Sequence, residues 1–334
     1  MIIPKEAVLW EEIEDRRIKC RLCNHFCIIG EGKKGKCRVR VNKEGKLFSL
    51  VYGDIIAEHA DPIEKKPFFH FLPGSLSFSI ATVGCNFSCL FCQNHSISQV
   101  EITNEQSFIS PEEIVNRALA SGCRSISYTY TEPTIFFEFA YDTAKKAREK
   151  GLKNNFVTNG YMSKEALEKI AEYLDAANVD LKGDGEFYKT LCGARRAPVI
   201  ENIKLMKKLG IWVEVTTLLI PEHNDSEVQI TEIADLIGEI DTAIPWHISR
   251  FYPSHKMSDY YSESSRKILQ ARDIGIKERL RYVYTGNISD TVGEHTYCYS
   301  CKKLLIHRRG FTVTENRISN GKCPFCAVAI DGVF

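Results

Sequence analysis

Strand-like and helix-like segments alternate through residues 76–290, and this alternation constrains the fold more than any other feature. Short apolar runs such as SLSFSIATV, SISYTY and KNNFVT are each followed by a longer amphipathic run. The first amphipathic run has Ser110 as a capping residue, Pro111 at the first helical position and Gly122 at its end. Seven such units predict a parallel sheet and favour an open or partial (β/α) barrel.

Polar side chains follow these strands at the carboxyl end, where such barrels carry their chemistry. Asp180 and Lys182 are two residues apart on one strand, so both side chains should point to the same face. They are the candidate catalytic pair, and an ion pair that only satisfies the barrel interior is the structural alternative. The other candidates at strand ends, which we expect to contact a cofactor, are Glu132, Thr158, Asn159, Thr217, His247 and Asn287.

Thirteen cysteines fall mainly into groups with ligand-like spacing. Three stand in CNFSCLFC, at Cys85, Cys89 and Cys92, whereas Cys123 and Cys192 are isolated and read as structural thiols. The sequence shows no signal peptide and no apolar run of membrane-spanning length, so we expect a cytoplasmic protein with reduced thiols. Thiolates there bind zinc or iron–sulfur clusters, and three cysteines on a [4Fe–4S] cluster leave one iron open.

Both flanks of the predicted barrel carry four cysteines. In residues 291–334, Cys298, Cys301, Cys323 and Cys326 form two C-x2-C knuckles, which predict a four-sulfur zinc site, with rubredoxin-type iron as the alternative. Residues 1–75 form an N-terminal segment and linker in which zinc is favoured and a second cluster is the alternative; its ligands would be Cys20, Cys23, Cys27 and Cys37.

The C-x3-C-x2-C pattern of CNFSCLFC resembles the signature of the radical S-adenosylmethionine (SAM) superfamily, and the QN that follows resembles the pyruvate formate-lyase activating enzymes. The resemblance implies a [4Fe–4S] cluster on Cys85, Cys89 and Cys92 whose open iron is chelated by SAM. It also implies an external electron donor and reductive cleavage of SAM. The resulting 5′-deoxyadenosyl radical abstracts a substrate hydrogen.

The same resemblance suggests individual roles. Glu132 stands where the superfamily usually has Gly-Gly-Glu, with Tyr130 and Thr131 in place of the glycines, and would contact the SAM amino group. VDLKG resembles the D-L-K of the activating enzymes, which places Asp180 and Lys182 near SAM.

FVTNGY resembles the D-T-N-G of those enzymes and places Thr158 and Asn159 near SAM. Val157 replaces the acid that holds a monovalent cation, which argues against cation binding here. His247 and His255 compete for the position of a family histidine near the ribose.

Taken with both flanks, the chain resembles the AmmeMemoRadiSam-system radical SAM enzymes over most of its length. This implies a partial barrel of radical SAM type with small metal modules at both ends. The favoured function is an activating-enzyme-like oxidoreductase that modifies a protein or peptide.

Two other functions remain open for this sequence. Modification of RNA or a small molecule is one alternative, supported by the basic run KKLLIHRRG but disfavoured for RNA by a net charge of +1. A non-enzymatic zinc or electron-transfer scaffold is the other, and it leaves the polar rim of the predicted barrel unexplained.

Overall fold

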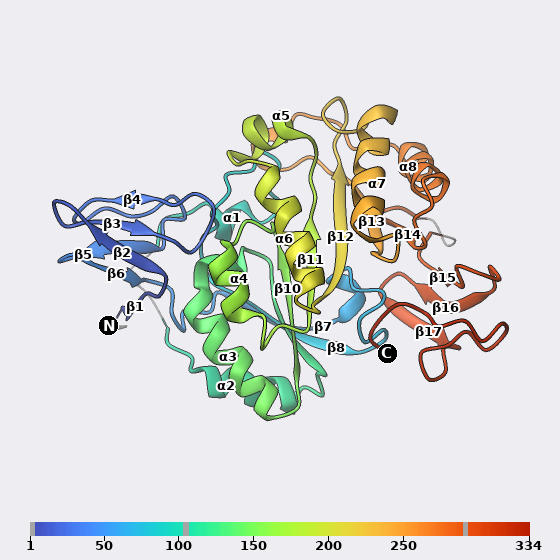
Figure 1. The fold of residues 1–334 in the computed structure, drawn as a ribbon, viewed down its shortest axis with the longest axis horizontal. Coiled ribbons are helices and arrows are strands. Elements are labelled where there is room, and N and C mark those ends of the chain that lie inside the picture. Colours follow the sequence, from blue (N-terminus) through green and yellow to red (C-terminus); the bar gives the residue numbers. More distant parts are fainter. Residues whose placement is uncertain (1–3, 103–106, 290–292) are drawn as a thin grey trace.

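A computed structural model describes residues 4–102, 107–289 and 293–334. Its centre is one eight-stranded sheet with the order β14-β13-β12-β11-β10-β9-β8-β7 (Figure 1). Strands β8 to β14 are parallel and follow one another in chain order, as successive βα units require. The edge strands β7 and β14 are not paired with each other in the described residues, so the barrel is partial, as the sequence predicts.

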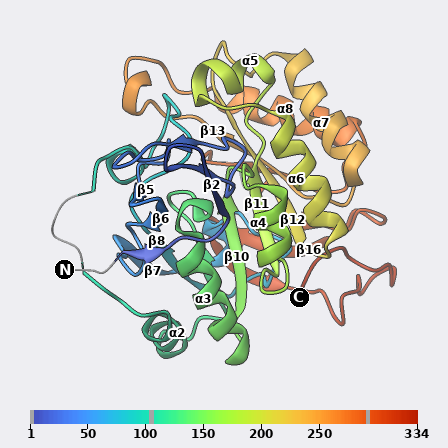
Figure 2. The same cartoon turned by 60° about the vertical axis from the view of Figure 1, so that its left-hand side comes forward.

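The sheet is covered by helices on its outer face (Figures 1 and 2). The strands are β7 (Ala57–Pro62), β8 (Leu76–Ala81), β9 (Ser125–Tyr128), β10 (Lys153–Thr158), β11 (Ala176–Asp180), β12 (Trp212–Leu219), β13 (Trp246–Arg250) and β14 (Val283–Gly286). The helices are α1 (His95–Ser98), α2 (Pro111–Ala120), α3 (Phe137–Glu149), α4 (Lys164–Ile170), α5 (Gly185–Phe187), α6 (Ala197–Lys208), α7 (Glu227–Asp241) and α8 (Ser265–Lys277).

Side-chain caps fix where several of these helices begin. Ser110 accepts a hydrogen bond from the Glu113 N–H at the start of α2, which confirms the predicted cap. Ser226 and Gln229 form a capping box at the start of α7. Each cap satisfies backbone donors that would otherwise lack partners, so the connecting loops enter the helices at defined points.

The sheet begins earlier in the chain than predicted. β7 lies within the segment that the sequence suggested was a linker, and it pairs antiparallel with β8 from Ala57 to Pro62. Its sequence, AEHADP, has no apolar alternation, since this edge strand buries few of its own side chains. The strand is stabilised mainly by its backbone hydrogen bonds to β8. The predicted boundary at residue 76 is therefore corrected to a position before residue 57.

The N-terminal segment forms two small antiparallel sheets beside the barrel, at the left of Figure 1. One contains β1 (Lys5–Glu6), β6 (Lys46–Ser49) and β5 (Arg40–Lys43), and the other contains β2 (Trp10–Ile13), β3 (Arg17–Cys20) and β4 (Ile28–Ile29). A buried ion pair between Arg40 and Glu138 of α3 joins this segment to the barrel. The Asn24 amide also donates to the Met162 carbonyl at 2.7 Å.

The C-terminal module is an antiparallel sheet of β15 (Thr296–Tyr297), β16 (Leu304–Arg309) and β17 (Thr312–Asn316), at the right of Figure 1. Its small core includes Leu305, Ile306 and Ile330 and packs on Phe69 and Tyr284 of the barrel. The predicted boundary between residues 290 and 291 lies outside the described residues.

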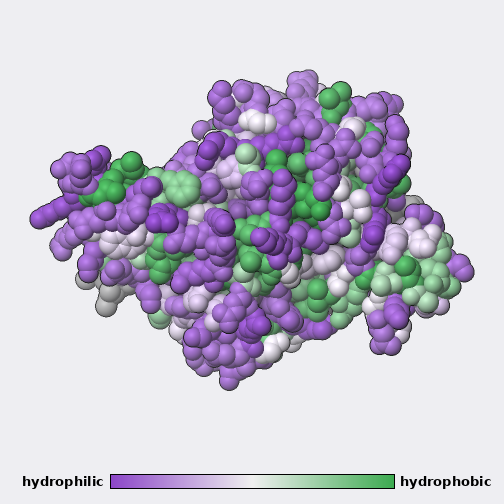
Figure 3. Space-filling model, in the orientation of Figure 1, coloured by the Kyte–Doolittle hydropathy of each residue, from purple (hydrophilic) through white to green (hydrophobic). Residues whose placement is uncertain are grey.

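The visible face of the molecule is mainly hydrophilic, with scattered apolar patches (Figure 3). None of the helices in the described ranges has both the length and the apolar character needed to cross a membrane.

Candidate active site

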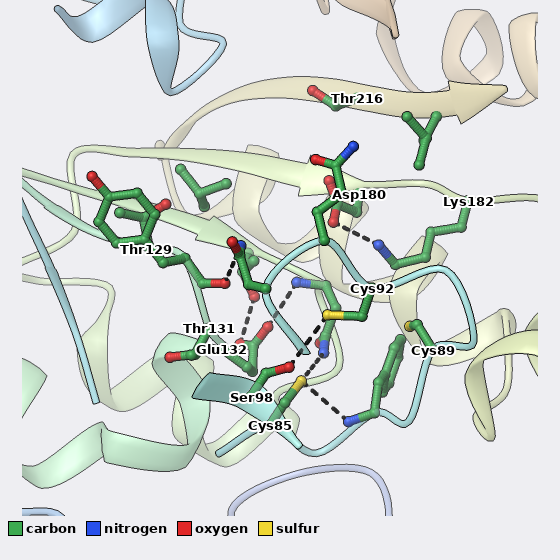
Figure 4. A pocket seen from close by; sticks show the side chains of 18 of the residues that line it. Cys85, Cys89, Cys92, Ser98, Thr129, Thr131, Glu132, Asp180, Lys182 and Thr216 are labelled. Carbon is green, nitrogen blue, oxygen red and sulfur yellow. Dashed lines mark hydrogen bonds and ion pairs between the residues drawn. The ribbon is translucent and has the colours of Figure 1, made fainter. Parts of the chain in front are cut away.

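A cavity of about 360 Å³ opens at the carboxyl ends of the parallel strands (Figure 4). Its volume lies in the usual range for a small-molecule site. The residues that line it come from the linker, the cysteine loop and the ends of successive strands. They include Lys65, Lys66, Cys85, Cys89, Cys92, Gln93, Asn94, Tyr130, Glu132, Thr158, Asn159, Asp180, Lys182, Thr216, Ser249 and Asn287.

The three cysteines of the loop after β8 face this cavity. The Phe87 N–H donates to the Cys85 sulfur at 3.3 Å, and the Cys92 sulfur lies 3.2 Å from the Ser98 hydroxyl. Such donors stabilise thiolates that bind a cluster. In the described residues these three sulfurs do not form a group within 4.8 Å of one another, so their arrangement does not match a single tetrahedral ion.

Glycine is required where the chain enters this loop. Gly84 has a φ of +104°, and a Cβ at this position would lie 2.6 Å from Val39 Cγ1 and 3.0 Å from the Cys37 carbonyl oxygen. Both the backbone angle and the close approach exclude a side chain. The loop that carries Cys85 is therefore packed directly against the N-terminal segment.

Glu132 is buried at the cavity wall and organises two strand ends. Its Oε1 accepts hydrogen bonds from the Thr134 N–H at 3.0 Å, the Thr134 hydroxyl at 2.5 Å and the Thr158 hydroxyl at 2.8 Å. Its Oε2 accepts one bond, from the Asn159 N–H at 2.8 Å. Burial raises the pKa of Glu132, and these donors oppose the shift. Oε2 keeps one acceptor position for a further donor.

Asp180 and Lys182 both line the cavity and form an ion pair of 2.6 Å, pointing toward each other in Figure 4. Burial acts to lower the pKa of Lys182, but the Asp180 carboxylate and the Cys89 and Cys192 thiols raise it well above its usual value. Lys182 is therefore a fixed cation beside the cysteine loop. The prediction that the two side chains share one face agrees with this placement.

Thr158, Asn159 and Asn287 also line the cavity, but Thr217 does not. Thr217 is buried on the other face of β12, where its hydroxyl donates to the Leu181 carbonyl and accepts from the Trp246 indole. Its neighbour Thr216 lines the cavity because successive side chains on a strand alternate between faces. The predicted contact at Thr217 is therefore reassigned to Thr216.

Neither candidate histidine lines the cavity. His247 is buried and bonds to Glu214 at 2.7 Å, inside a network that holds the linker against the sheet. His255 stacks on His95, with ring centroids 4.6 Å apart. The structure therefore corrects the prediction of a cofactor contact at His247 and does not supply one at His255.

The sequence also failed to indicate Lys66 as a cavity residue. Its ammonium pairs with Asp61 at 2.7 Å and lies 4.0 Å from the centre of the Tyr130 ring. Burial lowers the pKa of Lys66 to about 8. No sequence motif indicated Lys66, because it lies in the segment that was predicted to be a linker. The pairing of β7 with β8 places this segment at the edge of the cavity.

One of the isolated cysteines lies beside the candidate cluster site. Cys192 is buried, and its hydrogen bond to Cys89 is the main factor that lowers the pKa of Cys89. The backbone around it also supports the cysteine loop, since the Cys192 and Leu191 carbonyls accept from the Ser88 and Leu90 N–H groups.

The C-terminal cysteines form a compact four-sulfur group in which all ligand atoms lie within 4.8 Å of one another. The sulfurs of Cys298 and Cys326 are 3.7 Å apart, as are those of Cys301 and Cys323. Tetrahedral zinc with bonds of about 2.3 Å requires sulfur separations of about 3.8 Å. The residues therefore fit a single tetrahedral ion.

Comparisons with known proteins agree with this geometry. The sequence profile of the Radical SAM superfamily matches residues 79–233. The chain belongs to the radical SAM superfamily, whose enzymes use a [4Fe–4S] cluster and SAM, and it is a radical SAM enzyme.

Along its full length the chain is similar to the Uncharacterized protein MJ0808 of Methanocaldococcus jannaschii, with 43% identity over 98% of this chain and 99% of that protein. A putative glycyl-radical enzyme activating enzyme of the same organism, MJ1632, is 26% identical over 68% of this chain and 85% of its own length.

Among solved structures, Streptococcus suis SuiB bound to S-adenosylmethionine has a similar fold. The TM-score is 0.51, with 19% identity over 64% of this chain and 52% of SuiB.

Proposed function

We propose that this enzyme binds a [4Fe–4S] cluster through Cys85, Cys89 and Cys92, binds SAM in the adjoining cavity, and modifies a protein or peptide. The observation that carries the proposal is the convergence of three widely spaced thiols, a buried carboxylate and an ion pair on one cavity. When bound, the cluster supplies the electron that cleaves SAM and so generates the 5′-deoxyadenosyl radical. An external donor delivers that electron.

The side chains around the cavity supply complementary partners for SAM. Glu132 Oε2 keeps one acceptor position, which suits the SAM ammonium group. Lys182 offers a buried cation for the SAM carboxylate, and Asp180 offers acceptors for the ribose hydroxyls. Thr158 and Asn159 hold Glu132 in place, so they orient the site as well as lining it.

A protein or peptide substrate is supported by the relatives. MJ1632 is named as an activating enzyme for a glycyl-radical enzyme, and that similarity extends over most of its length. The exposed side chains of Gln93, Asn94 and Asn287 border the cavity, so a segment of another chain can approach it. The reaction would be an activating-enzyme-like oxidation in the cytoplasm. The C-terminal cysteines would hold structural zinc.

The test uses the full chain, purified and reconstituted without oxygen. Dithionite and SAM are added, and 5′-deoxyadenosine is measured by chromatography. We expect product from the wild type and from the control Cys123→Ala, whose thiol lies outside the cavity, but none from Cys89→Ala. Product from Cys89→Ala equal to that from the wild type would contradict the assignment of the cluster ligands.

The substrate class is tested separately. An extract of the native host is divided by ultrafiltration, and each fraction is added to the enzyme. A protein substrate predicts that the retained fraction accelerates 5′-deoxyadenosine formation and that protease treatment removes the effect. Acceleration by the small-molecule filtrate alone would refute a macromolecular substrate.

A further inference from the structure

The four N-terminal cysteines surround a second, smaller cavity beside the active site. Cys20, Cys23, Cys27 and Cys37 all line it, together with Arg40 and His25. They come from two separate small sheets and their loops, so the fold has gathered residues that are not close in the secondary structure. A convergence of four thiols on one cavity is typical of a metal centre.

The separation of the sulfurs distinguishes this group from the C-terminal one. In the described parts of the chain, the C-terminal sulfurs all lie within 4.8 Å of one another, whereas the N-terminal sulfurs form no such group. A single tetrahedral ion needs sulfurs about 3.8 Å apart. In a [4Fe–4S] cluster each thiolate binds a different iron, and in a [2Fe–2S] cluster the four thiolates are divided between two irons, so not all of the ligands can lie as close together as on a single ion. Cys85, Cys89 and Cys92 likewise form no such compact group.

Buried polar groups next to the N-terminal cysteines also point to a negatively charged occupant. The Arg40 side chain is 1% exposed, and its Nη1 lies 3.9 Å from the Cys20 sulfur. Its Nε has no hydrogen-bond partner in the structure, although it is buried. Glu138 pairs with the other end of the guanidinium. A buried donor without an acceptor is destabilising, and negatively charged thiolates on a metal centre would provide acceptors for the Arg40 guanidinium.

The N-terminal site and the catalytic loop share packing. The imidazole of His25, between Cys23 and Cys27, lies 2.8 Å from the Asn86 carbonyl oxygen. Asn86 follows Cys85, and its side chain contacts the Cys85 sulfur at 3.9 Å. Its buried Nδ2 has no hydrogen-bond partner. On the other side of Cys85, the Cys37 carbonyl oxygen packs against Gly84, where it would lie 3.0 Å from an added Cβ.

We infer that Cys20, Cys23, Cys27 and Cys37 hold a second iron–sulfur cluster next to the catalytic one, in place of the zinc that the sequence favours. The class of cofactor is inferred because the four sulfurs do not form the compact group of a single ion and a buried Arg40 donor next to them lacks a partner. The inference concerns a second metal centre and does not depend on SAM cleavage.

The test removes the catalytic cluster and asks what remains. The triple variant Cys85→Ala, Cys89→Ala and Cys92→Ala is purified without oxygen and reconstituted with iron and sulfide. Iron, sulfide and zinc are counted per chain, and the dithionite-reduced protein is examined by electron paramagnetic resonance. We expect iron and sulfide in equal number, about two or four each, with the resonance of a reduced cluster. One zinc should remain at the C-terminus.

A second pair of variants locates the remaining iron. Adding Cys23→Ser and Cys27→Ser to the triple variant should abolish iron, sulfide and the resonance while zinc stays. Adding Cys123→Ser, a matched control at a buried thiol outside both cavities, should change none of them.

Two zinc ions per chain without sulfide, iron without sulfide, or no metal beyond one zinc in the triple variant would each overturn the inference. The triple variant alone decides this, even if the added substitutions at Cys23 and Cys27 prevent folding. Because no SAM is used, failure of the proposed SAM chemistry would leave the result intact.

Discussion

Replacing Glu132 with Gln tests the proposed SAM contact, because the substitution keeps the size of the side chain and removes its charge. Oε1 is saturated by three donors and Oε2 accepts one, so the carboxylate has a single position left for the SAM ammonium group. A hydrogen bond to a charged group contributes about 1.5–3 kcal/mol. Its loss should weaken SAM binding by about 10- to 150-fold.

The same substitution should also reduce stability. The new amide nitrogen must face one of the present donors, such as the Asn159 or Thr134 N–H, and so leaves a buried donor without an acceptor. The expected loss is about 1–3 kcal/mol in the free energy of unfolding. SAM affinity is measured by anaerobic calorimetry on reconstituted enzyme, and stability is measured by urea unfolding.

Asp175→Asn is the matched control. Asp175 accepts from the Asn154 N–H at 2.9 Å and from Lys153 at 2.7 Å, at the opposite end of β10 from the cavity. It should lose stability without losing SAM affinity. If Glu132→Gln behaves in the same way, with unchanged SAM binding, then Glu132 only supports the rim and the proposed ammonium contact is wrong.

Three further predictions follow from the geometry. Cys323→Ser should remove one zinc per chain and expose the C-terminal module to proteolysis, since that short segment depends on its metal; retention of all zinc would contradict the assignment. Thr216→Val should weaken SAM binding by about 2- to 10-fold, whereas Thr217→Val should leave SAM binding unchanged. Thr217→Val should instead lower the free energy of unfolding by about 1–3 kcal/mol, because the buried Leu181 carbonyl and Trp246 indole would lose their hydrogen-bond partner. Burial lowers the pKa of His70 from about 6.5 in the unfolded chain to about 4 in the folded protein. The neutral imidazole therefore stabilises the fold above pH 6.5, and this stability is lost as the pH falls from about 6.5 to about 4. His70 should therefore contribute about 2 kcal/mol to the stability lost between pH 7 and pH 5, so urea unfolding of His70→Asn should show a loss about 2 kcal/mol smaller than that of the wild type; an equal loss in the variant would refute the assignment.

The sequence alone determined the features that depend on neighbours along the chain. The C-x3-C-x2-C loop predicted three candidate cluster ligands because all three thiols stand within eight residues, and the three cysteines line one cavity. The periodicity of the apolar residues predicted the parallel sheet, and the capping residue Ser110 marked the start of α2 correctly. Asp180 and Lys182 were placed on one face because a strand alternates with a period of two.

The tertiary structure decided what depends on partners far away in the chain. Thr216 lines the cavity and Thr217 does not, because packing across the sheet determines which face of β12 points toward the cavity. His247 lies outside the cavity and is hydrogen-bonded to Glu214 on the neighbouring strand. Lys66 reached the cavity through the pairing of a strand that has no apolar pattern of its own. The two four-cysteine groups look alike in the sequence, and only the distances between their sulfurs separate a compact tetrahedral site from a wider one. Sequence spacing specifies which thiols can converge, but the packing of the surrounding sheets sets how closely they approach.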